Sequence, residues 1–232
     1  MIADALRAIG QLGDPRFRGV LLRGVGLSVA LLAGATALLV WLARWLVGPT
    51  VTVPWIGDIT WLDEAAGVAV VPVALIASVF LMVPVASAFT GLFLDRIAQA
   101  VEDRHYPHLP PPRDQGWGEV ARETAGFLAL VIGVNALALI AYLALAPFAL
   151  LIFWAVNGFL LGREYGHMVA ARRMPAREAV AWRRANRLRL WATGVLMAVP
   201  LSVPVLNLLV PVVGAATFTH RFHRLRGLRP VR

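Results

Sequence analysis

Four long stretches of the chain contain no Asp, Glu, Arg or Lys and are rich in aliphatic residues: 24–43, 65–94, 124–162 and 190–220. Charged and proline-rich segments separate them. An α-helix needs about 20 apolar residues to cross the roughly 30 Å hydrocarbon core of a bilayer. The pattern therefore predicts an all-α integral membrane protein in which each uncharged stretch places helices in the membrane.

The composition supports this interpretation, because 59% of the 232 residues are hydrophobic and only 15% are charged, unlike a typical soluble domain. The first ten residues include Asp4 and Arg7 and lack the apolar core of a signal peptide, so we expect the first apolar stretch to stay in the mature chain. The net charge of +9 would suit nucleic acid. In so apolar a chain it instead predicts membrane lipid as the partner, with arginines at anionic headgroups and no nucleic acid.

The distribution of arginines predicts the orientation of the first two spans. Four arginines precede the first apolar stretch, whereas the loop after it carries only Arg44, together with three acidic residues. Basic residues near span ends stay on the cytoplasmic side, so the N-terminus and the 95–123 segment are expected inside. The predicted transmembrane helices are at about 19–47 and 65–104, and the second runs out of the membrane as an amphipathic extension.

The third and fourth stretches do not fit single crossings. A single span over 124–162 would place the eight arginines of the 163–189 segment outside, whereas a stretch that turns back keeps them inside. Halves of the third stretch, about 18 residues each, would reach roughly 27 Å, and halves of the fourth, about 13 residues each, near 20 Å. We therefore predict two partly penetrating, re-entrant helical hairpins, at about 120–162 and 188–220, in a single membrane domain over 1–232.

Prolines mark the expected tips of both hairpins. Pro147 interrupts the third stretch, and Pro200 and Pro204 interrupt the fourth; a proline inside a helix removes a hydrogen-bond donor and clashes with the preceding turn. Non-helical backbone at membrane depth is tolerated only against other protein or a water-filled cavity, so we also expect a homo-oligomer. Four ordinary spans with kinked helices and an imperfect arginine rule would fit the hydropathy as well.

Two polar segments are predicted to be helical. The 91–117 segment begins with apolar residues at helical spacing, carries its charges mostly on other faces, and should end its helix before Pro107. The 171–190 segment, with Pro175 in a first turn, is a basic helix. It either anchors the chain to the lipid surface or forms an electropositive vestibule that concentrates anions at a pore mouth.

The sequence contains no evident catalytic motif. Two histidine pairs have three-residue spacing, His105 with His108 and His220 with His223, but neither has an acidic or cysteine co-ligand at a recognisable spacing. Cysteine, a phosphate-cradling glycine loop and a serine nucleophile elbow are all absent from the sequence. We expect no enzyme activity, no metal site and no cofactor.

The segment "GDPRFRGVLLRG" at 13–24 is the best candidate for a binding site. Pro15 suits the start of a helix, which would direct unpaired backbone N–H groups toward the preceding loop, with Arg16 and Arg18 nearby. Guanidinium groups and helix-start donors together suit a tetrahedral oxyanion. Arginines beside a span also serve simply as topology determinants, and that alternative stays open.

Several motifs resemble one family of membrane proteins. "VPVLNLLVPVVGAATF" resembles the near-C-terminal "IPLLN…P…GAT" signature of CysZ-type sulfate permeases, in the etoposide-induced-protein domain superfamily. The signature places Pro204, Asn207, Pro211 and Gly214 at set intervals, which suggests a structural role in the second hairpin. Weaker matches follow in family order in "DPRFRGVLL", "SAFTGLFLDRIAQAVEDRHYP" and "WGEVARE", so the resemblance covers about residues 10–226.

The resemblance implies an oligomer with two long transmembrane helices and two partial hairpins, in the bacterial inner (cytoplasmic) membrane. It implies sulfate uptake for sulfur assimilation and cysteine biosynthesis, without an ATPase. The family's sulfate-binding G-L-R-R turn falls on Pro15, Arg16, Phe17 and Arg18. Only Arg18 matches a family arginine in place, and Pro15, which cannot donate a backbone N–H, replaces the glycine.

The sequence thus predicts a permease for sulfate or a related oxyanion, with the anion bound at 15–18. Further polar candidates along the pathway or at the inner face are Arg23, Glu102 and Arg122; ordinary solvation at the interface is the alternative for Glu102 and Arg122. The rival hypothesis for the whole chain is a non-transporting oligomeric membrane scaffold or accessory protein, in which the arginines only anchor the chain.

Overall fold

The computed structural model describes residues 1–20, 94–207 and 209–231, and a few positions between 22 and 58. The chain divides into two compact units, one of residues 1–21 with 92–232 and one of residues 22–91. In the second unit, strands β1 (Thr52–Val53) and β2 (Gly57–Asp58) pair antiparallel. The predicted transmembrane helices at about 19–47 and 65–104 lie outside the described residues, apart from scattered helical positions of the first and the last turns of the second.

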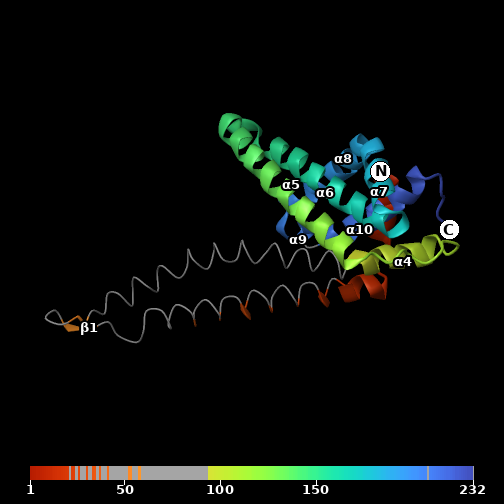
Figure 1. Cartoon of the computed structure of the whole chain (residues 1–232), viewed down its shortest axis with the longest axis horizontal. Coiled ribbons are helices and arrows are strands. Elements are labelled where there is room, and N and C mark those ends of the chain that lie inside the picture. The colour runs from red at the N-terminus through yellow and green to blue at the C-terminus, as the bar shows by residue number, and fades with distance from the viewer. Residues whose placement is uncertain are drawn as a thin grey trace. The chain divides into compact units, whose positions relative to one another are not determined.

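The described part of the first unit is built from helices (Figure 1). In chain order these are α1 (Ile2–Gly10), α4 (Asp95–His105), α5 (Trp117–Ala144), η2 (Ala146–Phe148), α6 (Ala149–Arg173), α7 (Ala176–Ala185), α8 (Arg187–Ala198), η3 (Val199–Ser202), α9 (Pro204–Asn207) and α10 (Val210–Leu225). Residues 15–20 are also helical. The predicted all-α fold is confirmed, with β1 and β2 as the only strands in the described part of the chain.

Helices α5 and α6 form a long helical hairpin (Figure 1). Pro147 lies in η2, which joins the two helices, so the predicted turn is present at that proline. The helices contain 28 and 25 residues, more than the predicted 18 or so, because both continue past the uncharged stretch into charged segments. The segments Trp117–Ala144 and Ala146–Arg173 are long and apolar enough to cross a membrane.

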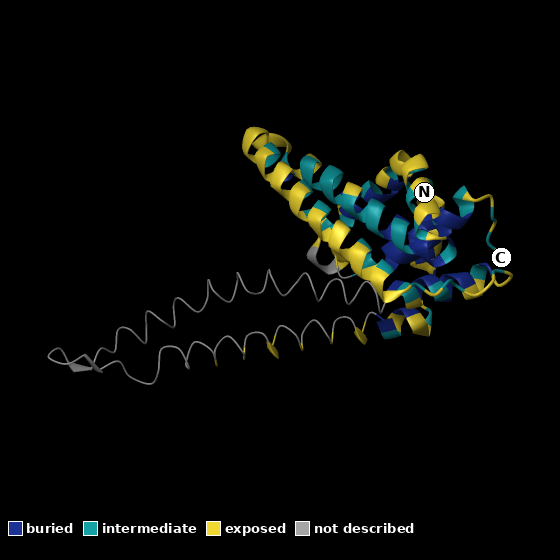
Figure 2. Ribbon diagram, in the orientation of Figure 1, coloured by how far each residue is buried: buried dark blue, intermediate teal, exposed yellow. Residues whose placement is uncertain are grey.

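Helix α5 exposes apolar side chains along most of its length (Figure 2). Ala138 is the only residue of this helix that is buried, whereas Ile132, Leu137, Ile140 and Leu143 are all more than half exposed. Contiguous apolar surface of this kind marks a face that meets lipid or other protein. Together with the hydropathy of the hairpin, it supports a membrane protein.

Glycines bring α6 and α8 unusually close together. Gly158, Gly162 and Gly166 recur at four-residue spacing on α6, and all three lie against α8. A Cβ atom on Gly162 would come within 2.6 Å of the Leu190 carbonyl oxygen, and one on Gly194 would overlap the Gly158 carbonyl oxygen. Small residues at this spacing let two helix backbones approach each other, notably in membranes.

The second predicted hairpin is represented by α8, the turns of η3 and α9, and α10. Its two longer helices contain 12 and 16 residues, close to the predicted 13. Pro200 lies in η3 and Pro204 begins α9, so the chain turns where the prolines predict. Pro211 lies in the first turn of α10, where a missing N–H costs no intrahelical bond.

Gly214 and Asn207, the other two residues of the family signature, differ in their surroundings. Gly214 is buried on α10, where an added Cβ would come within 3.0 Å of the Tyr165 ring of α6. Asn207 is exposed at the end of α9, and its side chain makes no hydrogen bond across the hairpin to any residue that the structure describes. Gly214 therefore has a clear packing role in this fold.

The basic segment at 171–190 is divided among three helices rather than forming one. Helix α6 ends at Arg173, Met174 is extended, and Pro175 immediately precedes α7 instead of lying in its first turn. The residue before a proline is sterically excluded from the helical region, which explains the break. A second break at Asn186 separates α7 from α8.

Helix α10 lies at the centre of the first unit and contacts α1, α4, α6 and α8 (Figure 2). Most of its residues are buried, and Phe222 meets the Trp182 ring of α7 edge-on at 4.8 Å between ring centroids. Helix α1 docks on α10 through the buried carboxylate of Asp4, which pairs with Arg224 at 2.5 Å and Arg221 at 3.9 Å. The core thus mixes apolar packing with buried ion pairs.

Candidate functional site

A helix begins at Pro15, as predicted. Asp14 caps this helix, because its Oδ1 accepts a hydrogen bond from the Arg16 backbone N–H at 2.9 Å. The Asp14 carbonyl oxygen accepts the first intrahelical bond, from the Arg18 N–H at 3.2 Å. Asp before the first turn satisfies a donor that has no partner in the helix. One of the N–H groups predicted to face an oxyanion is therefore already bound by a carboxylate.

The two arginines of this turn have different partners. Arg16 Nη1 lies 2.7 Å from Asp103 Oδ2 of α4, and the two side chains are 59% and 45% exposed. Exposed ion pairs of this kind contribute only about 0–1 kcal/mol, so another anion can compete for Arg16. Arg18 is exposed and forms no ion pair with a described residue. Phe17, between them, is buried and anchors the turn in the core.

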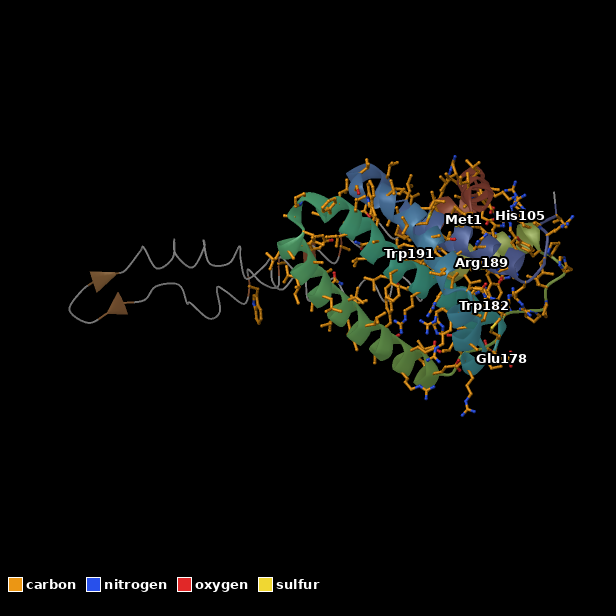
Figure 3. The ribbon with its side chains drawn as sticks, turned by 90° about the horizontal axis from the view of Figure 1, so that it is seen from above. Met1, His105, Glu178, Trp182, Arg189 and Trp191 are labelled. Atoms are coloured by element: carbon orange, nitrogen blue, oxygen red, sulfur yellow. The ribbon has the colours of Figure 1, made fainter. Side chains whose placement is uncertain are left out.

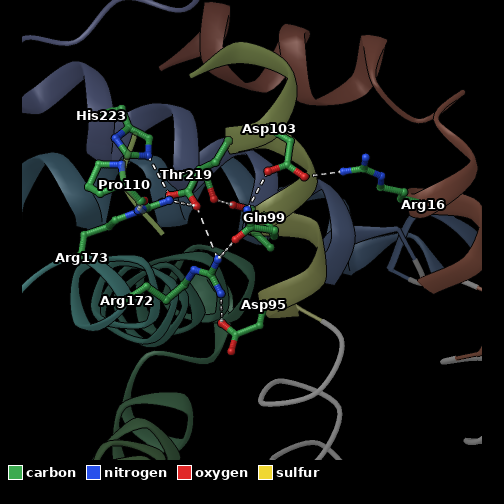
Figure 4. A network of polar contacts seen from close by, with 11 residues as sticks. Arg16, Asp95, Gln99, Asp103, Pro110, Arg172, Arg173, Thr219 and His223 are labelled. Carbon is green, nitrogen blue, oxygen red and sulfur yellow. Dashed lines mark hydrogen bonds and ion pairs between the residues drawn. The ribbon is translucent and has the colours of Figure 1, made fainter. Parts of the chain in front are cut away.

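A second polar site lies inside the first unit, around Glu102 of α4, where the side chains of Arg172, Arg173 and His223 converge (Figure 4). Glu102 is only 2% exposed. Its Oε1 accepts hydrogen bonds from Arg173 Nε at 2.8 Å and from His223 Nε2 at 3.0 Å. Its Oε2 is bonded by the terminal nitrogens of Arg172 and Arg173. One carboxylate thereby connects α4, α6 and α10, and the interpretation of Glu102 as a solvated interfacial residue is wrong.

The Glu102 network continues to the helix start at Pro15. Arg172 donates to Gln99 Oε1 at 2.8 Å, and Gln99 donates from Nε2 to Asp103 Oδ1 at 2.6 Å. Asp103 in turn holds Arg16 (Figure 4). The structure thus brings Arg16 and Glu102, which the sequence marked separately, into one chain of polar contacts.

Electrostatics keep Glu102 ionised. Burial alone would raise the pKa of its carboxyl, but the hydrogen bonds from His223 and Arg173, and the charges of Arg173 and Arg172, outweigh burial and hold the pKa at about 2. A carboxylate in this state compensates part of the charge of two buried arginines. The Glu102 carboxyl is therefore ionised at neutral pH.

The histidine pair on α10 faces the same interior. His220 and His223 are both buried, and the Tyr106 hydroxyl lies 3.2 Å from His220 Nδ1. Burial raises the pKa of Tyr106 to about 12, with the nearby charge of Asp4 acting in the same direction. No group of three or more potential metal ligands occurs among the residues that the structure describes.

The remaining predicted polar residues lie apart from this network. Arg122 is exposed on α5 and lines an open cavity of about 480 Å³ with Glu119, Pro175 and Arg177, between the starts of α5 and α7. Arg23 is helical and exposed but belongs to the other unit. Neither contributes to the Glu102 site in the described part of the chain.

Sequence reasoning did not link Arg172, Arg173 or His223 to Glu102. The double arginine before Pro175 was assigned to a basic helix that either anchors the chain to lipid or forms a vestibule for anions, and it lies about 70 residues from Glu102 in the sequence. No local pattern links positions so far apart. One sequence signal was available. Glu102 directly follows Val101 at the end of the apolar face of α4, which indicates that it lies beside the buried side of this helix.

The family model described as "Sulfate transporter CysZ/Etoposide-induced protein 2.4" matches residues 4–211. The chain belongs to this family. The match includes the helix start at Pro15, Glu102, both buried arginines and nearly all of the turn between α8 and α10, so the resemblance found in the sequence is confirmed. The CysZ/etoposide-induced protein family is a family of transporters and membrane proteins rather than of enzymes. No match was found among curated proteins.

Proposed function

We propose that this protein is a permease that carries sulfate or a related oxyanion into the cytoplasm for sulfur assimilation. The observation that carries the proposal is the exposed Arg16–Asp103 ion pair at the outer end of a polar network that continues to the buried Arg172 and Arg173. In a chain of a sulfate transporter family, this arrangement supplies an anion with exposed cationic contacts at one end of the network and with further cationic contacts inside the protein.

The capped helix start binds the anion on the cytoplasmic side. Arg18 is exposed without a described ionic partner, and Arg16 is held only by an exposed ion pair. A divalent oxyanion displaces the Asp103 carboxylate from Arg16 and gains the directional donors of a guanidinium group. Asp14 keeps the backbone end of the turn in place while the two side chains bind.

Carboxylates along the network keep the anion from binding too tightly. Asp103 competes for Arg16, and Glu102 competes for Arg172 and Arg173. Each arginine can therefore exchange one anionic partner for another without being left unpaired. Transport requires that binding be favourable enough for the anion to enter and weak enough for it to leave.

The proposed membrane arrangement is a homo-oligomer in the bacterial inner membrane, with the N-terminus and most basic segments in the cytoplasm. Helices α8 and α10 would reach about 18 Å and 24 Å at 1.5 Å per residue, less than the roughly 30 Å of hydrocarbon, which supports a re-entrant second hairpin. The apolar face of α5 offers a surface for lipid or for a neighbouring copy.

Uptake of labelled sulfate into proteoliposomes tests the proposed function. We expect the reconstituted protein to accumulate sulfate faster than protein-free vesicles, and excess unlabelled sulfate to compete. A monodisperse protein with a cooperative melting transition that gave no uptake would exclude the permease and favour the scaffold or accessory role. Unlabelled molybdate and phosphate as competitors define the anion class.

A further inference from the structure

A second group of cationic side chains lies where α5, α6 and α7 meet. Arg163 and His167 are one turn apart on α6, opposite Phe127 and Glu123, which are one turn apart on α5. His167 Nε2 lies 2.8 Å from Glu123 Oε2, and the Arg163 guanidinium lies over the Phe127 ring at 5.4 Å from its centroid. Arg183 of α7 lies close enough for its charge to interact with those of Arg163 and Glu123.

Each of the three cationic side chains has a buried nitrogen without a hydrogen-bond partner. These atoms are Arg163 Nη1, His167 Nδ1 and Arg183 Nε. Glu123 Oε2 pairs with His167 Nε2, so Nδ1 is the ring nitrogen left without a partner. Buried polar groups are nearly always paired in folded proteins, and guanidinium nitrogens can only donate, so the orphaned nitrogens of Arg163 and Arg183 indicate a missing partner rich in acceptor oxygens.

The surrounding charges make the group electropositive. Burial lowers the pKa of Arg183, and the charges of Arg163 and Arg184 lower it further against the opposing effect of Glu123. The acidic neighbours are Glu123 and Glu164, which face three arginines in all. Like charges held this close favour a bound anion.

The position of the group favours strong binding. Glu123 is the last charged residue before the uncharged 124–162 stretch, and Arg163 is the first after it, so both lie at the edge of the apolar part of the hairpin. The open cavity near Arg122 is lined by earlier residues of the same helices, α5 and α7. Figure 3 shows α7, marked by Glu178 and Trp182, beside the start of α5.

We propose that Arg163, His167 and Arg183 form a second oxyanion-binding site, separate from the helix start at Arg16 and Arg18. Its ligand is a tetrahedral sulfate or phosphate group, either free in solution or carried by an anionic lipid headgroup. Guanidinium groups match the acceptor oxygens of such a group in a directional way. The proposal deepens the proposed function, on which it rests for the assignment of sulfate as a transported ligand.

The test uses the full-length chain purified in detergent, and compares wild type with an Arg163→Gln/Arg183→Gln double variant. Arg187→Gln, which removes an exposed charge from α8, is the matched control. Equilibrium binding of labelled sulfate and native mass spectrometry of retained phospholipid are measured in parallel. For free sulfate, we expect two bound per wild-type chain, two per control chain and one per double-variant chain.

If a lipid supplies the phosphate group, wild type and control retain a phospholipid that the double variant loses, while sulfate binding is unchanged. Either loss supports the site. The proposed site is overturned by a double variant that melts at or above the wild-type temperature and shows unaltered sulfate stoichiometry and unaltered lipid. If the double variant does not fold, Arg183→Gln alone is used in its place. Loss of binding at Arg163 and Arg183 in a protein that transports no sulfate would leave this site standing while the permease proposal fails.

Discussion

At the scale of single residues, Glu102 joins three helices through ion pairs and hydrogen bonds. It is buried and bonded by Arg172, Arg173 and His223, so its carboxylate is the only described acceptor shared by all three. Removing one partner of a buried ion pair leaves the other charges desolvated and uncompensated. The free-energy cost of that loss exceeds the net stabilisation that the intact pair provides.

Replacing Glu102 with glutamine should therefore destabilise the protein by about 3–5 kcal/mol. Thermal unfolding in detergent measures the effect, and Glu178→Gln, at an exposed position on α7, is the control that should leave the melting temperature unchanged. Equal melting temperatures for Glu102→Gln and wild type would show that the network is not needed for the fold.

The same carboxylate should make stability depend on pH in the acidic range. Its pKa of about 2 in the folded state lies below its ordinary value of 4.5. The ionised form therefore contributes its full stabilisation above about pH 4.5, and the contribution is lost as pH falls from there toward about 2. Wild type should lose more stability over this interval than Glu102→Gln, which has no such group to protonate.

Asp103→Asn tests the idea that a carboxylate competes with the anion for Arg16. The amide keeps an oxygen for Gln99 but loses the charge that holds Arg16, so sulfate affinity should rise by up to about fivefold, the equivalent of about 1 kcal/mol. Equilibrium binding of labelled sulfate measures it, with the exposed Asp114→Asn as control. A weaker affinity in Asp103→Asn would mean that Asp103 helps to bind the anion.

Residue-level prediction from sequence succeeded where the chemistry is local. Pro15 begins a helix as expected, and Asp14 directly before it was an available sign of a cap. Glu102 was placed among polar candidates, but its burial depends on arginines that only the tertiary fold brings to it. Without those partners a glutamate at the end of an amphipathic helix resembles any solvated residue.

At the scale of elements, the α6–α8 contact depends on glycines rather than on large side chains. The backbones approach so closely that a single methyl group has no space at Gly194 or Gly162. The Gly-x-x-x-Gly-x-x-x-Gly pattern of α6 is visible in the sequence, and reading it would have predicted a close helix contact without naming its partner.

Gly194→Ala should force α6 and α8 apart and cost about 1–3 kcal/mol, the usual range for overpacking. Gly133→Ala on α5, where an added Cβ meets nothing within 4 Å, should be neutral or stabilising by up to about 1 kcal/mol, because alanine is the better helix former. Melting temperatures of both variants give the comparison. A Gly194→Ala protein as stable as Gly133→Ala would contradict the close contact.

Prolines and charges predicted the turns of both hairpins but not the lengths of the helices. The turns at Pro147 and at 199–209 lie where a helix interior excludes proline. The arms of the first hairpin were underestimated because the absence of charge was used as the helix limit, whereas Glu119, Arg122 and Arg163 lie within helices. A charged residue marks the end of the part of a helix that can lie in the hydrocarbon core, but the helix itself continues beyond it.

At the scale of the whole molecule, the first unit combines a long apolar hairpin with a polar, arginine-rich core, within a chain of the sulfate transporter CysZ/etoposide-induced protein 2.4 family. Composition alone predicted the membrane class, whereas the cytoplasmic placement of the basic segments from the arginine distribution stays a prediction. The polar network around Glu102 could not be predicted from these features, because they set the position of charges along the chain and not the contacts between them.

The central claim is that Arg16 and Arg18 bind the transported anion as it passes through the protein. The most direct test is the initial rate of labelled sulfate uptake, as a function of sulfate concentration, in proteoliposomes of wild type, Arg16→Ala/Arg18→Ala and Arg187→Ala/Arg189→Ala. The last variant removes the same charge from exposed positions on α8. At low sulfate, the first variant should be slower by about tenfold or more, since a hydrogen bond to a charged group contributes about 1.5–3 kcal/mol, and the α8 variant should match wild type. Equal rates in all three proteins, or equal losses in both variants, would contradict the account.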